Sequence, residues 1–544
     1  MATELITAQR PSRDSVRDTV ESIIVAFILA FVFRAFIVEA FIIPTGSMAP
    51  SLYGQHGQHR CSNCGYTYAY GLDDSALRQE LALTCPNCDW YCDLAGRGRL
   101  PLLSDNGDRI LVHKWPFDLG LSWLGPQRWS VIVFKNPLDG KQNYIKRLIG
   151  LPNEVLEIVD GDIYAAPLEK VPESIRAKLL SNPLLEHDRG LTGADTHQLD
   201  RLLAIRRKPA AAQSSLWMIH YNHDFPPVER TDESPVWSAA GSTADTGWEA
   251  ATPRVTFDGR DDREHELTLL GKPIADTYAY NARTMRGDFR REQRPVGDVL
   301  VRLLLTPRGA AGSFSMALSK RDDQFVAQIA ANGKLTLTRR GPRLPPATVA
   351  VGAIDPLESG RPLAIEFENL DYRVALRIDG REVLHTSDEE YRPDLAGLRG
   401  QLRGSDGAGS PSRVALAARG LALSIQHLAV YRDVYYRSVP TEPPPDNPYA
   451  LQGIPAWGTV NNPILLRDGE YFVCGDNSPA SKDSRLWWEN GDFVKRRGDA
   501  YQRGTVPADQ LIGQAFFVYW PGGHRLGERG LPVIPNVGRM RVIR

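Results

Sequence analysis

The chain has 544 residues, of which 42% are hydrophobic and 24% are charged, and its formal net charge at pH 7 is −1. A chain of this length holds about two to four domains, with enough material for buried cores. Because the charges balance, no global field attracts nucleic acid or an acidic substrate, so we expect no nucleic-acid partner.

The first predicted element is an apolar helix near the N-terminus. Residues 23–38 are apolar except for Arg34, whose long side chain can reach lipid headgroups. At about 1.5 Å per residue the run crosses much of a hydrocarbon core about 30 Å thick. We therefore predict a single transmembrane anchor at 20–40 in the cell's inner (cytoplasmic) membrane. Three arginines in the preceding segment, residues 1–19, favour a cytoplasmic N-terminus and an extracytoplasmic remainder. A cleavable secretory signal is the alternative, but no small-x-small pattern follows the run.

A serine loop follows the apolar run. Ser47 lies in Ile43-Pro44-Thr45-Gly46-Ser47-Met48-Ala49-Pro50, and Lys146 lies far downstream in Tyr144-Ile145-Lys146-Arg147. A serine hydroxyl needs a base, and a lysine is a base only when burial lowers its pKa from about 10.4. Strand alternation puts Lys146 on the face opposite Arg147, which would then point to solvent. Together the serine and the lysine suggest a Ser/Lys peptidase, although either one alone is typical of an ordinary turn or edge strand.

Five of the six cysteines are clustered between Cys61 and Cys92. Two C-x-x-C pairs, Cys61 with Cys64 and Cys85 with Cys88, are separated by twenty residues. This is the spacing of a zinc ribbon, in which four thiolates close a tetrahedral structural site. We therefore predict a structural zinc at these four cysteines. Two disulfides are the alternative, because the predicted compartment is oxidising.

The rest of the chain is predicted to be mainly β. Short β-rich runs separated by Gly, Pro, Asn and Asp indicate one compact β domain, and its pattern resumes near residue 469. These runs are residues 109–113, 130–134, 144–149 and 155–159. Asp160-Gly161 predicts a hairpin turn, a helix-compatible connector covers 168–208, and further strand-like runs fill 215–437. Regular strands without helices between them predict an inserted, jelly-roll-like β-sandwich, with a second hairpin at Asp379-Gly380.

The serine and lysine motifs, with two further boxes, resemble bacterial type I signal peptidase, a membrane-bound Ser/Lys endopeptidase that removes signal peptides from exported preproteins. The matching boxes are residues 41–52, 107–112, 131–135 with 143–152, and Gly475-Asp476-Asn477-Ser478-Pro479-Ala480-Ser481-Lys482-Asp483-Ser484-Arg485. The resemblance implies a β-rich catalytic core at 41–60, 93–164 and 449–544. Two insertions would interrupt it, the zinc ribbon at 61–92 and the connector with its sandwich at 165–440.

The resemblance also implies roles for individual residues. Ser47 would attack the scissile carbonyl, and Lys146 would take the proton of the serine hydroxyl and return it to the leaving amine. Cleavage would follow small residues and would need no cofactor. The Thr45 hydroxyl and the Ser47 N–H would form the oxyanion hole. Ser481 would orient the Lys146 ammonium, and Asp483 would pair with Arg485. The sequence departs from the family pattern at Ser478-Pro479-Ala480, so those positions are left without a role.

The insert resembles concanavalin-like and laminin-G-related modules through Asp379-Gly380 and the terminal run at 428–433. This resemblance implies a possible carbohydrate or cell-wall ligand, with a structural spacer as the alternative. The leading hypothesis is a membrane-anchored serine endopeptidase acting on preproteins at the lipid bilayer. The alternatives are an anchored extracytoplasmic binding protein with a degenerate peptidase core, and a Ser/Lys self-cleaving regulator.

Overall fold

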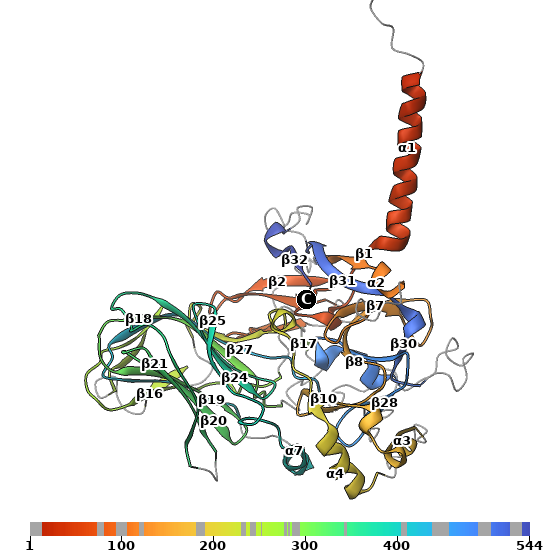
Figure 1. Cartoon of the computed structure of the whole chain (residues 1–544). Helices are drawn as coiled ribbons and strands as arrows, with labels where there is room; N and C mark the ends of the chain where they lie inside the picture. Colours follow the sequence, from red (N-terminus) through yellow and green to blue (C-terminus); the bar gives the residue numbers. More distant parts are fainter. Residues whose placement is uncertain are drawn as a thin grey trace, which may run out of the picture.

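The structure is a computed structural model that describes residues 14–72, 81–93, 106–118, 125–180, 191–229, 236–239, 246–251, 253–276, 280, 283–284, 294–341, 345–403, 411–437, 456–487, 502–522 and 536–543. It is mainly β, with one long helix projecting from a body of several sheets (Figure 1). Parts of the predicted segments 1–19, 61–92, 93–164, 165–440 and 449–544 lie outside the described residues.

The projecting helix, α1 (Asp14–Val32), corrects the predicted anchor at 20–40. The α-helix ends at Val32, a π-helical turn follows at Phe33–Ile37, and the chain then becomes strand β1 (Val38–Ile42). Charged side chains, including Arg17, Asp18 and Glu21, occupy the first part of α1. No helix in the described part of the chain is both long and apolar enough to cross a membrane.

The sheet that carries the serine and lysine motifs is built from segments far apart in the sequence. Its described strands are ordered β1-β6-β31-β7-β8-β29-β30, with β32 paired to β31. Their bounds are β6 (Arg109–His113), β7 (Val131–Lys135), β8 (Asn143–Gly150), β29 (Glu470–Cys474), β30 (Val506–Pro507), β31 (Leu511–Trp520) and β32 (Arg541–Val542). The pairing of β8 with β29 brings the lysine motif beside the box that begins at Gly475. The serine motif directly follows β1, at one edge of the same sheet.

A smaller four-stranded sheet leads from this core toward the insert. Its order is β11-β10-β9-β28, with bounds β9 (Glu154–Val159), β10 (Asp162–Pro167), β11 (Ala204–Ile205) and β28 (Ile464–Leu466). Asp160 and Gly161 have φ values of 54° and 87° and form the predicted turn between β9 and β10. The connector contains the helices α3 (Glu173–Leu180) and α4 (Gly193–Leu202), and a Thr192–Asp195 capping box starts α4.

The described strands of the insert form two antiparallel sheets. One has the order β14-β15-β27-β18-β23-β24-β25 with β12 on β27, and the other has the order β13-β16-β26-β19-β20-β21-β22. The bounds in the first sheet are β12 (Met218–Asn222), β14 (Trp248–Ala251), β15 (Arg254–Phe257), β18 (Val299–Pro307), β23 (Leu363–Leu370), β24 (Arg373–Ile378), β25 (Arg381–His385) and β27 (Leu423–Arg432). Those in the second are β13 (Trp237–Ala239), β16 (His265–Leu269), β19 (Ser313–Lys320), β20 (Asp323–Ala330), β21 (Lys334–Arg340), β22 (Ala347–Ala353) and β26 (Val414–Arg419).

Both sheets of the insert contribute to one hydrophobic core. Val301 and Phe367 come from the first sheet, Phe314 and Phe325 from the second, and all four are buried in the same cluster. The predicted hairpin at Asp379-Gly380 joins β24 to β25, and both residues have positive φ. Helix α7 (Leu395–Arg403) lies at the edge of the insert, near α4 (Figure 1).

The cysteine-rich segment forms two small hairpins between the core and the insert. The first pairs β2 (His56–Arg60) with β3 (Thr67–Gly71), and the second pairs β4 (Leu81–Thr84) with β5 (Tyr91–Asp93). A short strand of the insert, β17 (Arg283–Thr284), adds to the second hairpin by pairing with β4. The insert and the cysteine-rich segment therefore share one sheet.

Candidate active site

Ser47 and Lys146 lie in direct contact, although they are 99 positions apart in the sequence. Lys146 Nζ donates a hydrogen bond to Ser47 Oγ at 2.6 Å. Ser47 is part of the 3₁₀ turn Gly46–Met48, which follows β1, and Lys146 lies on β8. The distance is within the range of about 2.6–3.2 Å that a general base needs.

The environment of Lys146 favours its neutral form. The side chain is buried, and in the described part of the chain no carboxylate oxygen lies within 4.0 Å of Nζ. Burial lowers the pKa of Lys146 from 10.5 to about 8, although the charges of Asp483 and Asp476 act in the opposite direction. The amine is therefore a usable base in mildly alkaline solution.

The segment after β29 holds the serine loop in place. Asn477 donates twice, from its backbone N–H to the Ser47 carbonyl and from Nδ2 to the Gly46 carbonyl, both at 3.0 Å. A Cβ on Gly475 would lie 2.4 Å from the Ser47 carbonyl oxygen and 2.2 Å from Ser481 Oγ. Only glycine therefore permits this close approach of the two loops. Both residues belong to the motif quoted from the sequence, but nothing in their spacing indicated these contacts.

The predicted pair of Asp483 and Arg485 is present and buried. Arg485 Nε and Nη2 donate to the two carboxylate oxygens at 2.8 and 2.7 Å, and the Gly475 N–H donates to the same carboxylate at 2.9 Å. Burial works against ionisation of Asp483, but the Arg485 guanidinium outweighs it and lowers the pKa of that carboxyl. Ser478, which the sequence left without a role, accepts a hydrogen bond from Arg485 Nη1 at 2.8 Å.

Ser481 and Thr45 lie at the site without the contacts expected of them. Ser481 Oγ is buried and interacts with the Asp483 carboxylate, whose ionised form it favours. In the described part of the chain it forms no hydrogen bond to Lys146, so the expected contact is not seen. Thr45 is exposed immediately before the 3₁₀ turn, and its side chain makes no capping hydrogen bond. Its role as an oxyanion donor with the Ser47 N–H stays a prediction.

Arg147 corrects the expectation that it would face solvent. The residue is fully buried, and its guanidinium donates to Asp476 at 2.7 and 2.8 Å. It also donates to the Trp129 carbonyl at 2.6 Å. The alternation rule identified opposite faces correctly but failed on exposure, because both faces of β8 are covered at this point.

Tyr280 of the insert packs against the serine loop, and no motif around it in the sequence indicated this contact. A Cβ on Gly46 would lie 2.3 Å from a carbon of the Tyr280 ring, and a Cβ on Gly71 would lie 2.6 Å from the same carbon. The ring therefore fills the space beside both glycines. The ring also stacks on Tyr53, with ring centroids 5.3 Å apart. The insert therefore contacts the residue directly before the nucleophile candidate.

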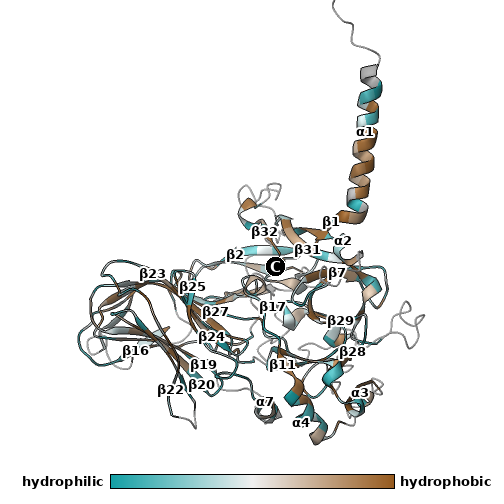
Figure 2. Ribbon diagram, in the orientation of Figure 1, coloured by the Kyte–Doolittle hydropathy of each residue, from teal (hydrophilic) through white to brown (hydrophobic). Residues whose placement is uncertain are grey.

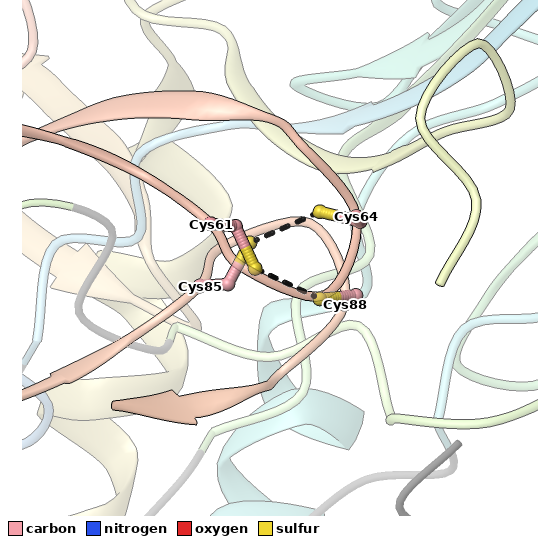
Figure 3. Close-up of side chains that lie close together, drawn as sticks. All are labelled: Cys61, Cys64, Cys85 and Cys88. Carbon is pink, nitrogen blue, oxygen red and sulfur yellow. Dashed lines mark hydrogen bonds between the residues drawn. The ribbon is translucent and has the colours of Figure 1, made fainter. Parts of the chain in front are cut away.

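The four paired cysteines converge as predicted (Figure 3). Their Sγ atoms all lie within 4.8 Å of one another, with Cys61 to Cys88 at 3.7 Å and Cys64 to Cys85 at 3.6 Å. A tetrahedral zinc with Zn–S bonds of about 2.3 Å requires sulfur separations of about 3.8 Å. A disulfide requires a sulfur separation of about 2.05 Å, and none of the six cysteines forms one in the structure. The donor set and its spacing therefore suit a closed four-thiolate metal site.

The two cysteine turns also attach the insert to the core. Asn63 and Asn87 occupy the same place in each turn, and each makes two hydrogen bonds to backbone of the insert. Asn63 Nδ2 donates to the Glu229 carbonyl at 2.6 Å, and Asn63 Oδ1 accepts from the Glu229 N–H at 2.7 Å. Asn87 Nδ2 donates to the Phe225 carbonyl at 2.7 Å, and Asn87 Oδ1 accepts from the Asn222 N–H at 2.6 Å. These hydrogen bonds hold residues 222–229 of the insert against the cysteine turns.

Part of the chain matches a known family. The model of the family described as "Signal peptidase, peptidase S26" matches residues 91–224 and 417–520, less than half of the chain. Lys146, Ser481, Asp483 and Arg485 lie within the matched residues, and Ser47 lies outside them.

Several curated relatives are named signal peptidase I. The protein of Rickettsia bellii is 26% identical over 144 residues, which cover 26% of this chain and 37% of the relative. That of Pseudomonas fluorescens is 24% identical over 217 residues, covering 38% of this chain and 56% of the relative. The chain thus spans between about a third and just over half of the length of these relatives.

Solved structures similar to part of this chain include the carbohydrate-binding module CBM66 from Bacillus subtilis, with 10% identity and a TM-score of 0.23. That match covers 36% of this chain and 96% of the module. The exoplasmic domain of VIP36 in a calcium- and mannose-bound form matches with 6% identity and a TM-score of 0.25, covering 38% of this chain and 86% of that one. TM-scores this low support no inference about a ligand, so the carbohydrate ligand and the concanavalin-like fold of the insert stay predictions.

Proposed function

We propose that the chain is a serine endopeptidase that removes signal peptides from exported preproteins, with Ser47 as the nucleophile and Lys146 as the general base. The observation that carries the proposal is the 2.6 Å hydrogen bond between Ser47 Oγ and a buried lysine with a lowered pKa. The family match and the curated relatives support the reaction class and the preprotein substrate.

In the proposed reaction, neutral Lys146 removes the proton from Ser47 Oγ as that oxygen attacks the scissile carbonyl carbon. The Ser47 N–H and the Thr45 hydroxyl then stabilise the oxyanion. Lys146 passes its proton to the leaving amine, and an acyl-enzyme forms on Ser47. Lys146 next activates a water molecule that hydrolyses this ester and restores the serine hydroxyl. Asn477 and Gly475 keep the serine loop close to the wall built by Asp483 and Arg485.

The test is cleavage of a purified preprotein by the purified full chain, followed by mass and sequence analysis of the products. Ser47→Ala and Lys146→Met should each abolish cleavage while the circular dichroism spectrum is unchanged. Ser62→Ala and Lys135→Met are the matched controls, because both change the same residue types outside the site. Full activity of Lys146→Met would reject the lysine as the base, and an inactive wild-type protein would reject the peptidase.

We also propose that the cysteine site holds one structural zinc ion. The four thiolates would supply all ligands, so the metal would stabilise the two hairpins and leave no open position for chemistry. Metal analysis should find about one zinc per chain. Cys64→Ser should lose the metal, whereas Cys92→Ser should keep it because Cys92 is outside the four-sulfur group. Four oxidised cysteines without bound metal would reject the zinc site and show two disulfides in its place.

Contact with lipid is a further proposal, and it rests on the surface of α1. Apolar side chains from Val20 to Val32 are about half exposed or more, and α1 projects away from the body as a largely hydrophobic helix (Figure 2). Such a surface is typical of a helix that contacts a bilayer. Flotation of the full chain with phospholipid vesicles tests this location, and Phe27→Glu with Phe31→Glu should reduce it.

A further inference from the structure

A cleft of about 240 Å³ opens beside the serine loop, between the core, the first cysteine hairpin and the insert. Ala49 and Pro50 of the serine loop line one side, together with Asn477. Half-buried aromatic side chains line the other sides: Tyr66 from the cysteine hairpin, and Trp217 and Tyr431 from the insert. Small-molecule sites usually measure about 300–1,000 Å³, so this cleft is suited to one or two side chains of a longer chain.

The strand that borders the cleft, β3, has an outer edge that pairs with no other described strand. Thr67, Tyr68 and Ala69 of β3 line the cleft, and among the described strands β3 pairs only with β2. The Cys61 N–H donates to the Tyr66 carbonyl, which makes these two residues a hydrogen-bonded pair. Paired residues alternate along an antiparallel ladder, so the backbone groups of Thr67 and Ala69 point away from β2 and toward the outer edge.

Gly71 confirms this alternation, because it is the next residue of β3 whose backbone groups should point toward the outer edge. Its N–H donates to the carbonyl of Tyr280 at 2.7 Å, on the side away from β2. The backbone of Tyr280 therefore already uses the outer edge of β3 at Gly71. Thr67 and Ala69 offer the same kind of edge, and no backbone hydrogen bond to either from outside β2 is present in the described part of the chain.

We propose that this cleft is a second binding site for the preprotein, where an extended segment some residues away from the scissile bond pairs with β3 at Thr67 and Ala69. Edge strands commonly bind extended peptides in this way, since backbone hydrogen bonds give affinity and adjacent pockets select side chains. The aromatic walls select apolar or aromatic side chains of that segment. The cleft begins two residues from Ser47, so one polypeptide can reach both places. The inference rests on the proposed peptidase function.

The experiment compares a full-length preprotein with a short peptide that spans only about four residues on each side of the same scissile bond. Ala69→Trp fills the cleft, and Thr67→Pro removes an outward N–H from β3 while leaving the hydrogen-bonded pairs with β2. Gln58→Trp is the matched control, because Gln58 is exposed on β2 in register with Ala69 and does not line the cleft. Initial rates give kcat and KM for each substrate, and the zinc content and circular dichroism of each variant report on folding.

Both cleft variants should raise KM for the full-length preprotein about tenfold, the value of about 1.4 kcal/mol in lost contacts, and should leave kcat and the short peptide unchanged. The control should behave as the wild type with both substrates. Equal effects on the two substrates, or no effect on either from folded variants, would overturn the second site while leaving the peptidase intact. Failure of the wild type to cleave either substrate would overturn the peptidase and this inference together.

Discussion

The pH dependence of cleavage is the sharpest prediction from the site, because it depends on the burial of Lys146. With a pKa of about 8, roughly one molecule in ten carries a neutral amine at pH 7. An ordinary lysine with a pKa of 10.5 would be neutral in only about one molecule in 3,000. The environment therefore increases the fraction of usable base about 300-fold, which corresponds to about 3 kcal/mol.

We expect kcat/KM to rise about tenfold per pH unit in acid solution and to level off above about pH 8. The assay is the initial rate of cleavage of a preprotein peptide between about pH 6 and 10 at constant ionic strength, with circular dichroism recorded at each pH. Lys135→Met should show the same profile, because Lys135 lies outside the site. An acid limb centred near pH 6.5 would indicate a histidine base, and that result would refute the assignment of Lys146.

The same lowered pKa predicts an effect on stability. Because the pKa of Lys146 is lower in the folded state than in the unfolded state, its ammonium form opposes folding. This opposition is complete below about pH 8, fades as the pH rises toward 10.5, and is absent above that value. Lys146→Met should therefore be more stable than the wild type at pH 7, by up to about 3 kcal/mol before the lost hydrogen bond is subtracted. Thermal unfolding of both proteins at pH 7 and pH 10 measures this difference in stability. A difference that is the same at both pH values would contradict the lowered pKa of Lys146.

Three further predictions concern the support of the site. Gly475→Ala should reduce cleavage more than about 100-fold, because its Cβ would lie 2.4 Å from the Ser47 carbonyl oxygen. Gly193→Ala, which has no atom within 4 Å of the new Cβ, should cleave normally in the same rate assay. Arg147→Met should destabilise the fold by about 3–5 kcal/mol, because it leaves a buried carboxylate unpaired, and a normal thermal midpoint would contradict that pairing. Tyr280→Ala should lower kcat about tenfold through a looser serine loop, whereas the exposed Tyr91→Ala should leave kcat unchanged in steady-state kinetics.

Local patterns predicted the features that depend on neighbouring residues. The hairpin at Asp160-Gly161 forms because two adjacent residues that tolerate positive φ are flanked by strand formers. The cysteine group forms because two short turns each place their sulfurs on one side. The contact between Ser47 and Lys146 was found by a different route, since their motifs resemble a family and the two residues are 99 positions apart in the sequence.

The sequence patterns did not predict the features that depend on long-range packing. Arg147 was expected in solvent because alternation predicts faces but does not show what covers each face, and Asp476 lies 329 residues away. Tyr280 has no neighbouring motif, so its contact with the serine loop depends on how the insert folds back onto the core. The predicted anchor failed at its C-terminal end, where residues 38–42 pair with β6 and leave the helix.

The burial of Lys146 also bears on the choice between a peptidase and a binding protein with a degenerate core. A buried amine with a pKa lowered by burial costs about 3 kcal/mol at neutral pH, a large part of the 5–15 kcal/mol that typically separates folded from unfolded chains. Methionine would fill the same space without that cost. The hydrogen bond to Ser47 offsets only part of that cost, so a scaffold would be more stable without the lysine. A peptidase needs a neutral amine beside its serine hydroxyl, so the destabilising residue at this position favours the enzyme.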